Sequence, residues 1–376
     1  MPEVPTPPIP ATDKKEFPCQ KCGAKLQFKP GTDAIVCDYC GHSQKVEVAP
    51  EKKGSIVEHD FLKAISEAPS QSIQELNKNG KEVQCNGCGA NTVISEQSGH
   101  CPFCGSPIVV DAKSSSNEKV IVPESILPFN IDKNKAKNLF MEWIDSLWFA
   151  PNDLKKRAQT TGMDGVYLPY WTYDTNTTTN YRGERGEYYY TTETFTNSKG
   201  ETETRQVRHT RWYPASGTVH VDFDDVLVCA SRSLPQDLID ELEPWDLENL
   251  KPYDSAYLSG FITERYKTHL KEGFEIAKDK MEPEIESAIN HDIGGDEQRI
   301  NSKNVDYQKI TFKHILLPLW ISSFRYTEKV YRFMINARTG EVQGERPYSK
   351  IKIALAVIGG AILAYGGYYI YQMYLQ

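Results

Sequence analysis

The chain has 376 residues, a length that favours two or three domains. Its formal net charge is −8 at pH 7, whereas a protein that binds nucleic acid needs a positive surface to displace counterions from phosphates. Hydrophobic residues make up 39% of the sequence, which is low for a single large globular domain. Composition and charge therefore count against a nucleic-acid-binding protein and against one large globule.

The N-terminal residues 1–16 are expected to form an extended tail. Five of the first ten residues are proline, and such a tract cannot build a packed core. No apolar run follows a basic start, so the segment does not resemble a secretory signal.

Eight of the nine cysteines form four C-x-x-C pairs, which in such a chain indicate metal ligands rather than disulfides. Glycine follows the second cysteine of each pair and tolerates the positive φ that a tight knuckle needs. Two knuckles joined by a short hairpin complete a tetrahedron around one ion. We expect two zinc ribbons, with the ligand sets Cys19, Cys22, Cys37, Cys40 and Cys85, Cys88, Cys101, Cys104.

Four thiolates leave no coordination position for water, which favours two structural zinc ions over catalytic ones. Metal binding would also supply the folding energy, about 10–16 kcal/mol in zinc-finger peptides. A pair of redox dithiols is the alternative, and His42 or His100 could replace a cysteine, although surface histidines are the simpler interpretation. No arginine precedes Arg157, which argues further against contacts of the ribbons with DNA or RNA.

The segment between the ribbons, residues 49–83, is expected to be a helical linker, with short helices near 60–68 and 72–78. Further along, apolar residues recur at helical spacing between Ile131 and Trp148 and predict a helix with a core-facing stripe. Threonine, tyrosine and valine dominate 166–231, where Asn197-Ser198-Lys199-Gly200 is typical of a hairpin turn that projects from the domain.

Residues 236–290 are expected to be mainly helical, with breaks at Pro244, Pro252 and Pro283, and residues 305–346 to return to strands. A short repeat links the two β regions, since Val166–Trp171 and Ile315–Trp320 both place Leu-Pro before an aromatic end. Proline cannot donate to a sheet ladder, so these segments are expected to begin strands or to lie at sheet edges. The repeat suggests two related α+β halves.

No sequence pattern for nucleotide binding, zinc proteolysis or serine hydrolysis occurs. Asp222 and Asp224 share one face of an expected strand and could act as acid and base or hold a metal, but solvated strand charges are the preferred interpretation. Cys229 follows an apolar run and is expected to be a buried, inert thiol. We therefore assign no catalytic residue.

Residues 353–375 are uncharged and mostly apolar, and as an α-helix they would span roughly 34 Å, against about 30 Å for the hydrocarbon core. A buried core helix fits poorly, because the segment is apolar around its whole circumference. We expect one transmembrane helix at 351–376 in the cytoplasmic membrane. By the positive-inside rule the basic residues before it place the N-terminal part in the cytoplasm; they are Arg338, Arg346, Lys350 and Lys352.

Small residues spaced by four share one face of this helix: Ala356, Gly360 and Ala364. They allow close approach of a second helix, which points to a homo-oligomer through the tail helix or to a membrane partner. Small residues are also common in membrane helices without such a role, so the spacing leaves both interpretations open.

Several motifs follow one another in a characteristic order, and together they resemble a family of bacterial zinc-ribbon membrane proteins. Members are often encoded near phage-shock or flotillin-like (SPFH) proteins, and some carry a primosomal, helicase-like name. The resemblance implies a membrane adaptor that gathers such partners during envelope stress, and it lends no catalytic residue. Its motifs are Cys101-Pro102-Phe103-Cys104-Gly105-Ser106, Leu168-Pro169-Tyr170-Trp171-Thr172-Tyr173, Tyr181-Arg182-Gly183-Glu184-Arg185-Gly186 and Leu316-Leu317-Pro318-Leu319-Trp320.

The sequence thus predicts an α+β protein with two small four-cysteine zinc ribbons, a mixed α+β domain rich in antiparallel strands and one C-terminal transmembrane helix. The expected function is a non-enzymatic adaptor that recruits cytoplasmic or membrane protein partners at the bilayer. A nucleic-acid-binding zinc-ribbon factor of replication or transcription is the alternative. The expected segments are the tail (1–16), first ribbon (17–48), linker (49–83), second ribbon (84–112), α+β domain (113–350) and membrane helix (351–376).

Overall fold

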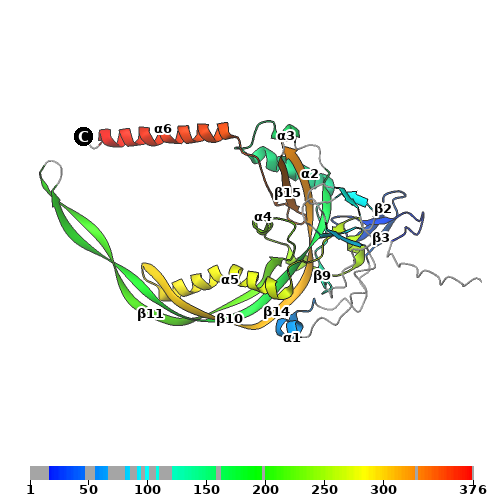
Figure 1. Cartoon of the computed structure of the whole chain (residues 1–376), viewed down its shortest axis with the longest axis horizontal. Helices are drawn as coiled ribbons and strands as arrows, with labels where there is room; N and C mark the ends of the chain where they lie inside the picture. Colours follow the sequence, from blue (N-terminus) through cyan, green and yellow to red (C-terminus); the bar gives the residue numbers. More distant parts are fainter. Residues whose placement is uncertain are drawn as a thin grey trace, which may run out of the picture.

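A computed structural model describes residues 17–46, 56–66, 81–84, 91–94, 98–100, 107–109, 121–157, 162–196, 200–326 and 329–374. Within these residues the chain is an α+β protein rich in antiparallel strands, as the sequence predicts. Figure 1 shows a body that holds the short elements, a long curved arm of strands, and the terminal helix α6, which leaves the body on the same side as the arm. The expected tail lies outside the described residues.

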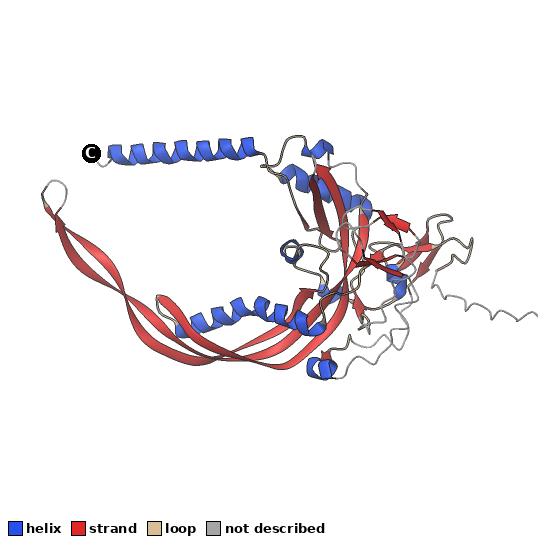
Figure 2. Cartoon of the chain, in the orientation of Figure 1, coloured by secondary structure: helices blue, strands red, loops and turns tan. Residues whose placement is uncertain are grey.

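The arm is built on β10 (Asp164–Thr196), which pairs antiparallel with β11 (Thr202–Cys229) on one side and β14 (Glu297–Tyr326) on the other. At about 3.3 Å per residue β10 is roughly 110 Å long. Pairing with β14 ends at Gly186↔Glu297, and beyond that point β10 and β11 continue as a two-stranded ribbon. The hairpin predicted around 197–200 therefore projects from the domain (Figure 2).

Helix α5 (Leu270–Ile293) lies along the arm and buries one stripe against it, which includes Phe274, Met281 and Ile289. Two tyrosines of β10 fix its ends. The Tyr173 hydroxyl donates to the Leu270 carbonyl over 2.7 Å, and the Tyr181 hydroxyl donates to Asp292 over 2.6 Å. The buried stripe runs through the whole helix, so α5 packs against the arm as one unit.

Pro283 lies inside α5, so the helix break expected there is wrong. Its side chain is on the exposed face, where water can satisfy the carbonyl that loses its hydrogen-bond donor. Apolar contacts on both sides of Pro283, from Met281 and Ile285, hold the helix to the sheet. Packing thus outweighs a local cost of about 3 kcal/mol.

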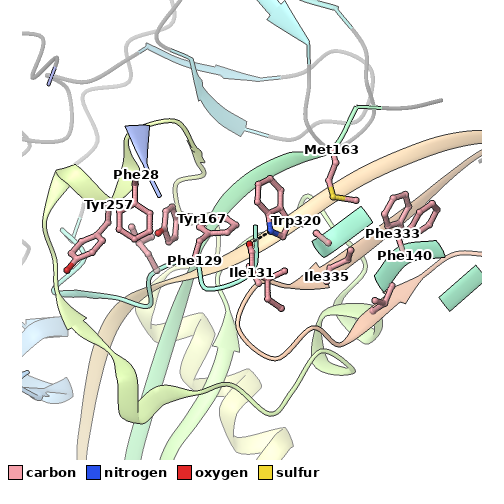
Figure 3. Packing of buried hydrophobic residues seen from close by; sticks show 14 of the residues in the cluster. Phe28, Phe129, Ile131, Phe140, Met163, Tyr167, Tyr257, Trp320, Phe333 and Ile335 are labelled. Carbon is pink, nitrogen blue, oxygen red and sulfur yellow. Dashed lines mark hydrogen bonds between the residues drawn. The ribbon is translucent and has the colours of Figure 1, made fainter. Parts of the chain in front are cut away.

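The predicted helix at 131–148 is α2 (Lys133–Ser146), capped by Asp132, whose carboxylate accepts from the backbone N–H groups of Asn134 and Lys135. Phe140 of α2 stacks on Phe333 with ring centroids 3.6 Å apart. Figure 3 shows this stack at one end of a continuous apolar core that reaches past Trp320 to Phe28. The remaining body elements next to it are β9 (Ser125–Ile126), α3 (Leu154–Arg157), β15 (Lys329–Asn336) and β16 (Val342–Gly344).

Residues 236–269 contain short pieces rather than the helices that the sequence predicts. Prolines at 244 and 252 interrupt any apolar period, and the segment crosses the body in turns that bury single side chains such as Leu242, Trp245 and Tyr257. Its elements are α4 (Gln236–Asp240), two 3₁₀ turns (Leu247–Asn249 and Ser255–Leu258), β12 (Lys251–Pro252) and β13 (Ile262–Thr263).

The described residues of the N-terminal third form short strands and one short helix. The linker helix expected at 60–68 is α1, preceded by a strand that pairs with β14. The helix expected at 72–78 lies outside the described residues. The elements are β1 (Leu26–Phe28), β2 (Ala34–Cys37), β3 (Ser43–Lys45), β4 (His59–Asp60), α1 (Phe61–Ser66), β5 (Lys81–Gln84), β6 (Asn91–Ile94), β7 (Ser98–His100) and β8 (Pro107–Val109).

The prolines of the repeated motif, Pro169 and Pro318, lie within long strands, so their expected place at strand starts or sheet edges is wrong. The Pro169 carbonyl accepts from Ala230, and the Pro318 carbonyl accepts from Ala337. Because N and C=O of one strand residue point the same way, each ring nitrogen faces that same edge. On that edge of β10, Pro169 lies between the residues paired with β13 and those paired with β11. On the same edge of β14, Pro318 lies between the residues paired with β9 and those paired with β15. The missing N–H of each proline therefore removes no hydrogen bond of a sheet ladder.

Candidate metal centre

The four thiols of the first predicted ribbon meet at one point. The sulfur atoms of Cys19, Cys22, Cys37 and Cys40 all lie within 4.8 Å of one another. Cys19 Sγ is 3.5 Å from Cys40 Sγ, and Cys22 Sγ is 3.6 Å from Cys37 Sγ. A tetrahedral zinc ion with Zn–S bonds of 2.3 Å separates its sulfurs by about 3.8 Å. These four residues therefore lie close enough to bind one metal ion.

Each cysteine pair is shaped by the same turn. Gly23 and Gly41, which follow the second cysteines, have φ values of 74° and 70°. Their N–H groups donate back to the first cysteine of each pair, to the Cys19 carbonyl over 2.8 Å and to the Cys37 carbonyl over 2.9 Å. A side chain on either glycine would strain this turn, so the glycines explain why both knuckles close in the same way.

Electrostatics in the cluster favour a cation at its centre. Burial opposes ionisation of Cys19, but the backbone N–H groups of Lys21 and Cys22 outweigh it and lower the Cys19 pKa to about 7. The Ala24 N–H lowers the pKa of Cys22, yet the Cys40 thiol beside it and burial raise it to about 12. Four thiols this close cannot all ionise without a compensating charge, and a bound metal supplies that charge.

The segment that carries the four thiols, residues 17–46, is docked on the body. The Phe28 N–H donates to the Ser259 carbonyl over 2.9 Å, and the Ser259 hydroxyl donates to the Leu26 carbonyl over 2.6 Å. The Phe28 ring meets Tyr257 edge-on at 5.2 Å (Figure 3). The opposite side of the ribbon faces solvent, with Cys22, Cys40 and the 86% exposed side chain of Tyr39. The cluster is thus a rigid feature of the body with an open outer face.

The second expected ligand set, Cys85, Cys88, Cys101 and Cys104, lies outside the described residues. The strands around it form two antiparallel pairs, β5–β6 and β7–β8. Among the described residues of the first ribbon, His42 takes part through its carbonyl, which accepts from the Cys37 N–H over 2.8 Å, and it is not part of the four-thiol group.

A second cluster, made of acidic side chains, lies where the arm meets the body. Asp174, Asp224 and Asp225 bring carboxylate oxygens within 4.8 Å of one another. The Lys313 ammonium is 2.7 Å from Asp225 Oδ1 and 3.9 Å from Asp174 Oδ2, and it compensates their charge. Burial raises the pKa of Asp174 to about 6. Asp222, which the sequence paired with Asp224, instead accepts from the Asn176 amide over 2.6 Å.

Sequence reasoning missed Asp174 and Lys313 because no local spacing joins them to Asp224, and it placed Asp225 on the face opposite to Asp224. Asp225 adopts a positive φ of 52°, and the register shifts between Tyr173 and Thr175, so a bulge turns these carboxylates together. The predicted inert thiol Cys229 is buried, and burial raises its pKa to about 12. Neither the group of Asp174, Asp224 and Asp225 nor Cys229 combines a nucleophilic side chain with a base that could activate it.

Helix α6 (Lys350–Tyr374) is long and apolar enough to cross a membrane, and none of its apolar span is buried inside the protein. Large side chains are exposed around its whole circumference, Leu355, Val357 and Leu363 among them. A helix that is apolar on all sides and unpacked in water requires another apolar solvent. α6 is therefore a candidate membrane span.

Comparison with known proteins adds one relative. The chain is 26% identical over 360 residues to the uncharacterized protein YdjG of Bacillus subtilis (strain 168), an alignment that covers 93% of this chain and 95% of that protein. No family model matches the chain, and no solved structure matches it.

Proposed function

We propose that this protein is a single-pass adaptor of the cytoplasmic membrane, in which structural zinc ribbons present contact surfaces to protein partners. The observation that carries the proposal is the combination of a closed four-thiol cluster, docked on a rigid body, with a fully exposed apolar helix. A closed cluster stabilises a surface and leaves no position at which a metal-bound water could react.

The orientation follows from charge and redox chemistry. Lys350 and Lys352 lie at the start of α6, and Arg338 and Arg346 lie shortly before it. Positive-inside topology then places the thiols in the cytoplasm, where they stay reduced and available to zinc. The resemblance to the zinc-ribbon membrane proteins supports SPFH or phage-shock proteins as the partners.

Metal identity also belongs to this proposal. Four cysteine sulfurs at near-tetrahedral separations are the ligand set that selects zinc or an iron–sulfur centre. The glycine-closed knuckles are typical of zinc ribbons, and we assign zinc to the first site and, by the same spacing, to the second.

The alternative function in nucleic-acid binding is less well supported. The outer arm interleaves arginines with aromatic rings, as in Arg208 over Tyr188 at 4.2 Å, a combination that also binds single strands. Carboxylates pair with its cations, however: Arg185 with Glu187 at 2.7 Å and Arg205 with Glu193 at 3.2 Å. These pairs cancel the field that phosphates would need.

In-cell crosslinking followed by purification from detergent-solubilised membranes tests the adaptor. Tyr39→Ala removes the exposed side chain between Cys37 and Cys40 and leaves every metal ligand in place. We expect this variant to lose a crosslinked partner, while Tyr190→Ala on the arm, also an exposed aromatic, retains it. The proposal fails if the wild-type chain crosslinks to no protein, or if the partner is captured equally by the Tyr39 variant.

A further inference from the structure

The loop between α2 and α3 exposes a large aromatic side chain to water. Trp148 is 79% exposed, whereas Trp171, Trp245 and Trp320 are buried, and Trp143 and Trp212 are partly buried. Phe149, next in the chain, is also exposed. Tryptophan gains free energy from burying its ring, so an exposed Trp-Phe pair indicates a surface that meets something apolar.

This loop touches the point where α6 begins. The Ser349 N–H donates to the Phe149 carbonyl over 2.7 Å, one residue before the helix starts. The Lys352 ammonium donates to the carbonyls of Trp148 and Ala150 over 3.0 and 2.8 Å. These contacts keep Trp148 within about one helical turn of the first residue of α6.

The aromatic surface continues across the chain entry to α6. Tyr348 is 56% exposed, and its hydroxyl accepts from Arg346 Nε over 3.2 Å. An apolar groove joins this tyrosine to the loop and to the first turns of the helix; its lining residues are Phe149, Tyr348, Ile353, Ala356 and Val357. Aromatic rings here are therefore flanked by Arg346, Lys350 and Lys352.

We propose that Trp148 and Phe149, together with Tyr348, form a second membrane contact that enters the headgroup–acyl boundary of the leaflet where α6 begins. The inference rests on the proposed membrane anchoring by α6 and adds the lipid surface as a partner of the body. Trp and Tyr rings are the side chains that prefer this boundary, and Lys and Arg beside them reach the lipid phosphates. The body would then contact the lipid surface directly, in addition to being attached to the bilayer through α6.

Tryptophan quenching by brominated lipids tests this contact selectively, because α6 contains no tryptophan. The full chain is reconstituted in nanodiscs whose lipids carry bromine either near the top or near the end of the acyl chain. We expect lipids with shallow bromines to quench at most about one sixth of the tryptophan fluorescence, the share of one residue among the six tryptophans. Lipids with deep bromines should quench less of it. Trp148→Phe should abolish this loss, and Trp212→Phe, on the arm, should preserve it.

Flotation of reconstituted vesicles after alkaline extraction separates this inference from the anchoring on which it depends. If the chain does not float, membrane anchoring by α6 is overturned and the contact with it. If the chain floats but its tryptophan emission is the same with and without bromine, or if Trp148→Phe leaves the quenching unchanged, the loop does not reach the lipid. Quenching that disappears only in Trp148→Phe supports the second contact.

Discussion

Trp171 of β10 and Trp320 of β14 occupy equivalent positions: each indole N–H donates over 2.8 Å to a backbone carbonyl two residues before a long helix. Trp171 binds the Thr268 carbonyl ahead of α5, and Trp320 binds the Ile131 carbonyl ahead of α2. The two strands pair antiparallel about Leu168↔Leu317, the central residues of the repeated motif. Each tryptophan thus reaches from one half of the chain into the other.

The short parallel strands obey the same correspondence. β13 pairs with β10 at Val166, and β9 pairs with β14 at Ile315, which is the matching position of the repeat. In chain order each half contains a short strand, a helix and a long hairpin, and each short strand pairs with the long strand of the other half. We propose that the body consists of two related units that have exchanged their first strands.

This equivalence predicts equal effects of Trp171→Phe and Trp320→Phe. Either change keeps most of the ring volume but leaves a buried carbonyl without its donor, which costs about 1–3 kcal/mol. We expect similar losses in the free energy of unfolding, measured by urea titration in detergent micelles. Trp148→Phe is the matched control and should change it little. A loss confined to one of the two buried sites would argue against equivalence.

The metal cluster predicts that Cys22→Ser lowers the metal content by one ion per chain, because a tetrahedral site with three thiolates binds much more weakly. Elemental analysis of the purified protein measures the content. Cys229→Ser, which removes the buried thiol outside the cluster, is the control and should leave it unchanged. Chelation of the wild-type metal should also speed amide exchange between residues 17 and 46. Unaltered metal content in the Cys22 variant would contradict this assignment.

Gly273 of α5 predicts a substitution effect opposite to helix propensity. Alanine usually stabilises a helix by about 1 kcal/mol relative to glycine. A Cβ at Gly273, however, would lie 2.4 Å from the Tyr173 hydroxyl and 2.9 Å from the Trp171 ring. We expect Gly273→Ala to destabilise the protein by about 1–3 kcal/mol in thermal unfolding. Gly359→Ala in α6, where no atom lies within 4 Å, is the helical control, and an unchanged or raised stability of Gly273→Ala would refute the close approach.

His314 predicts a loss of stability in acid. Burial between Trp171 and Tyr266 lowers its pKa to about 4, from the usual value near 6.5. The unfolded chain therefore binds a proton first, and the contribution to stability, complete above pH 6.5, is lost as pH falls toward 4. At pH 5 the loss is about 2 kcal/mol.

Urea unfolding at pH 7.5 and pH 5 measures this slope. His314→Phe keeps a ring in place and should flatten the pH dependence, although it also loses the hydrogen bond to the Ile121 carbonyl at every pH. His220→Asn, at an exposed position on the arm, should leave the slope as in the wild type. An identical slope in the His314 variant would show that another group titrates.

The proposed topology predicts that the arm and the ribbon lie on one side of the membrane. The outer hairpin carries charges such as Arg205 and Arg208 and cannot enter hydrocarbon. Trypsin should therefore cut it in inverted membrane vesicles and spare it in intact spheroplasts. Because α6 leaves the body on the same side as the arm (Figure 1), a bilayer perpendicular to the helix would meet the arm. We expect α6 to change its direction relative to the arm when it inserts.

Much of the local structure could be predicted from sequence, because its causes are local. C-x-x-C-Gly knuckles predict the cluster of Cys19 and its three partners, and the apolar stripe from 131 to 148 predicts α2. Gly200 has a positive φ of 81° and lies next to the end of the β10–β11 pairing, at the position where the sequence predicts a hairpin turn. In each of these cases the residues that determine the structure lie within a few positions of one another.

The failures concern features set by distant partners. Pro283 stays helical because the arm holds α5, and Pro169 fits mid-strand because two neighbouring strands happen to meet there. Asp174 and Lys313 are distant in the sequence but lie on the paired strands β10 and β14. Their contact also depends on a β-bulge that no local sequence pattern predicts. These errors come from tertiary contacts that override local preference.

The contacts between the two halves have a consequence for how the protein is made. Trp171 has no partner carbonyl until Thr268 has been synthesised, and the first ribbon cannot dock before Ser259 has left the ribosome. The N-terminal half must therefore wait, with its long strands unpaired along one edge, for most of the chain to appear. During this delay the unpaired edges of the strands are prone to aggregation. A chaperone that binds nascent strands should therefore raise the yield of native protein more than faster translation does.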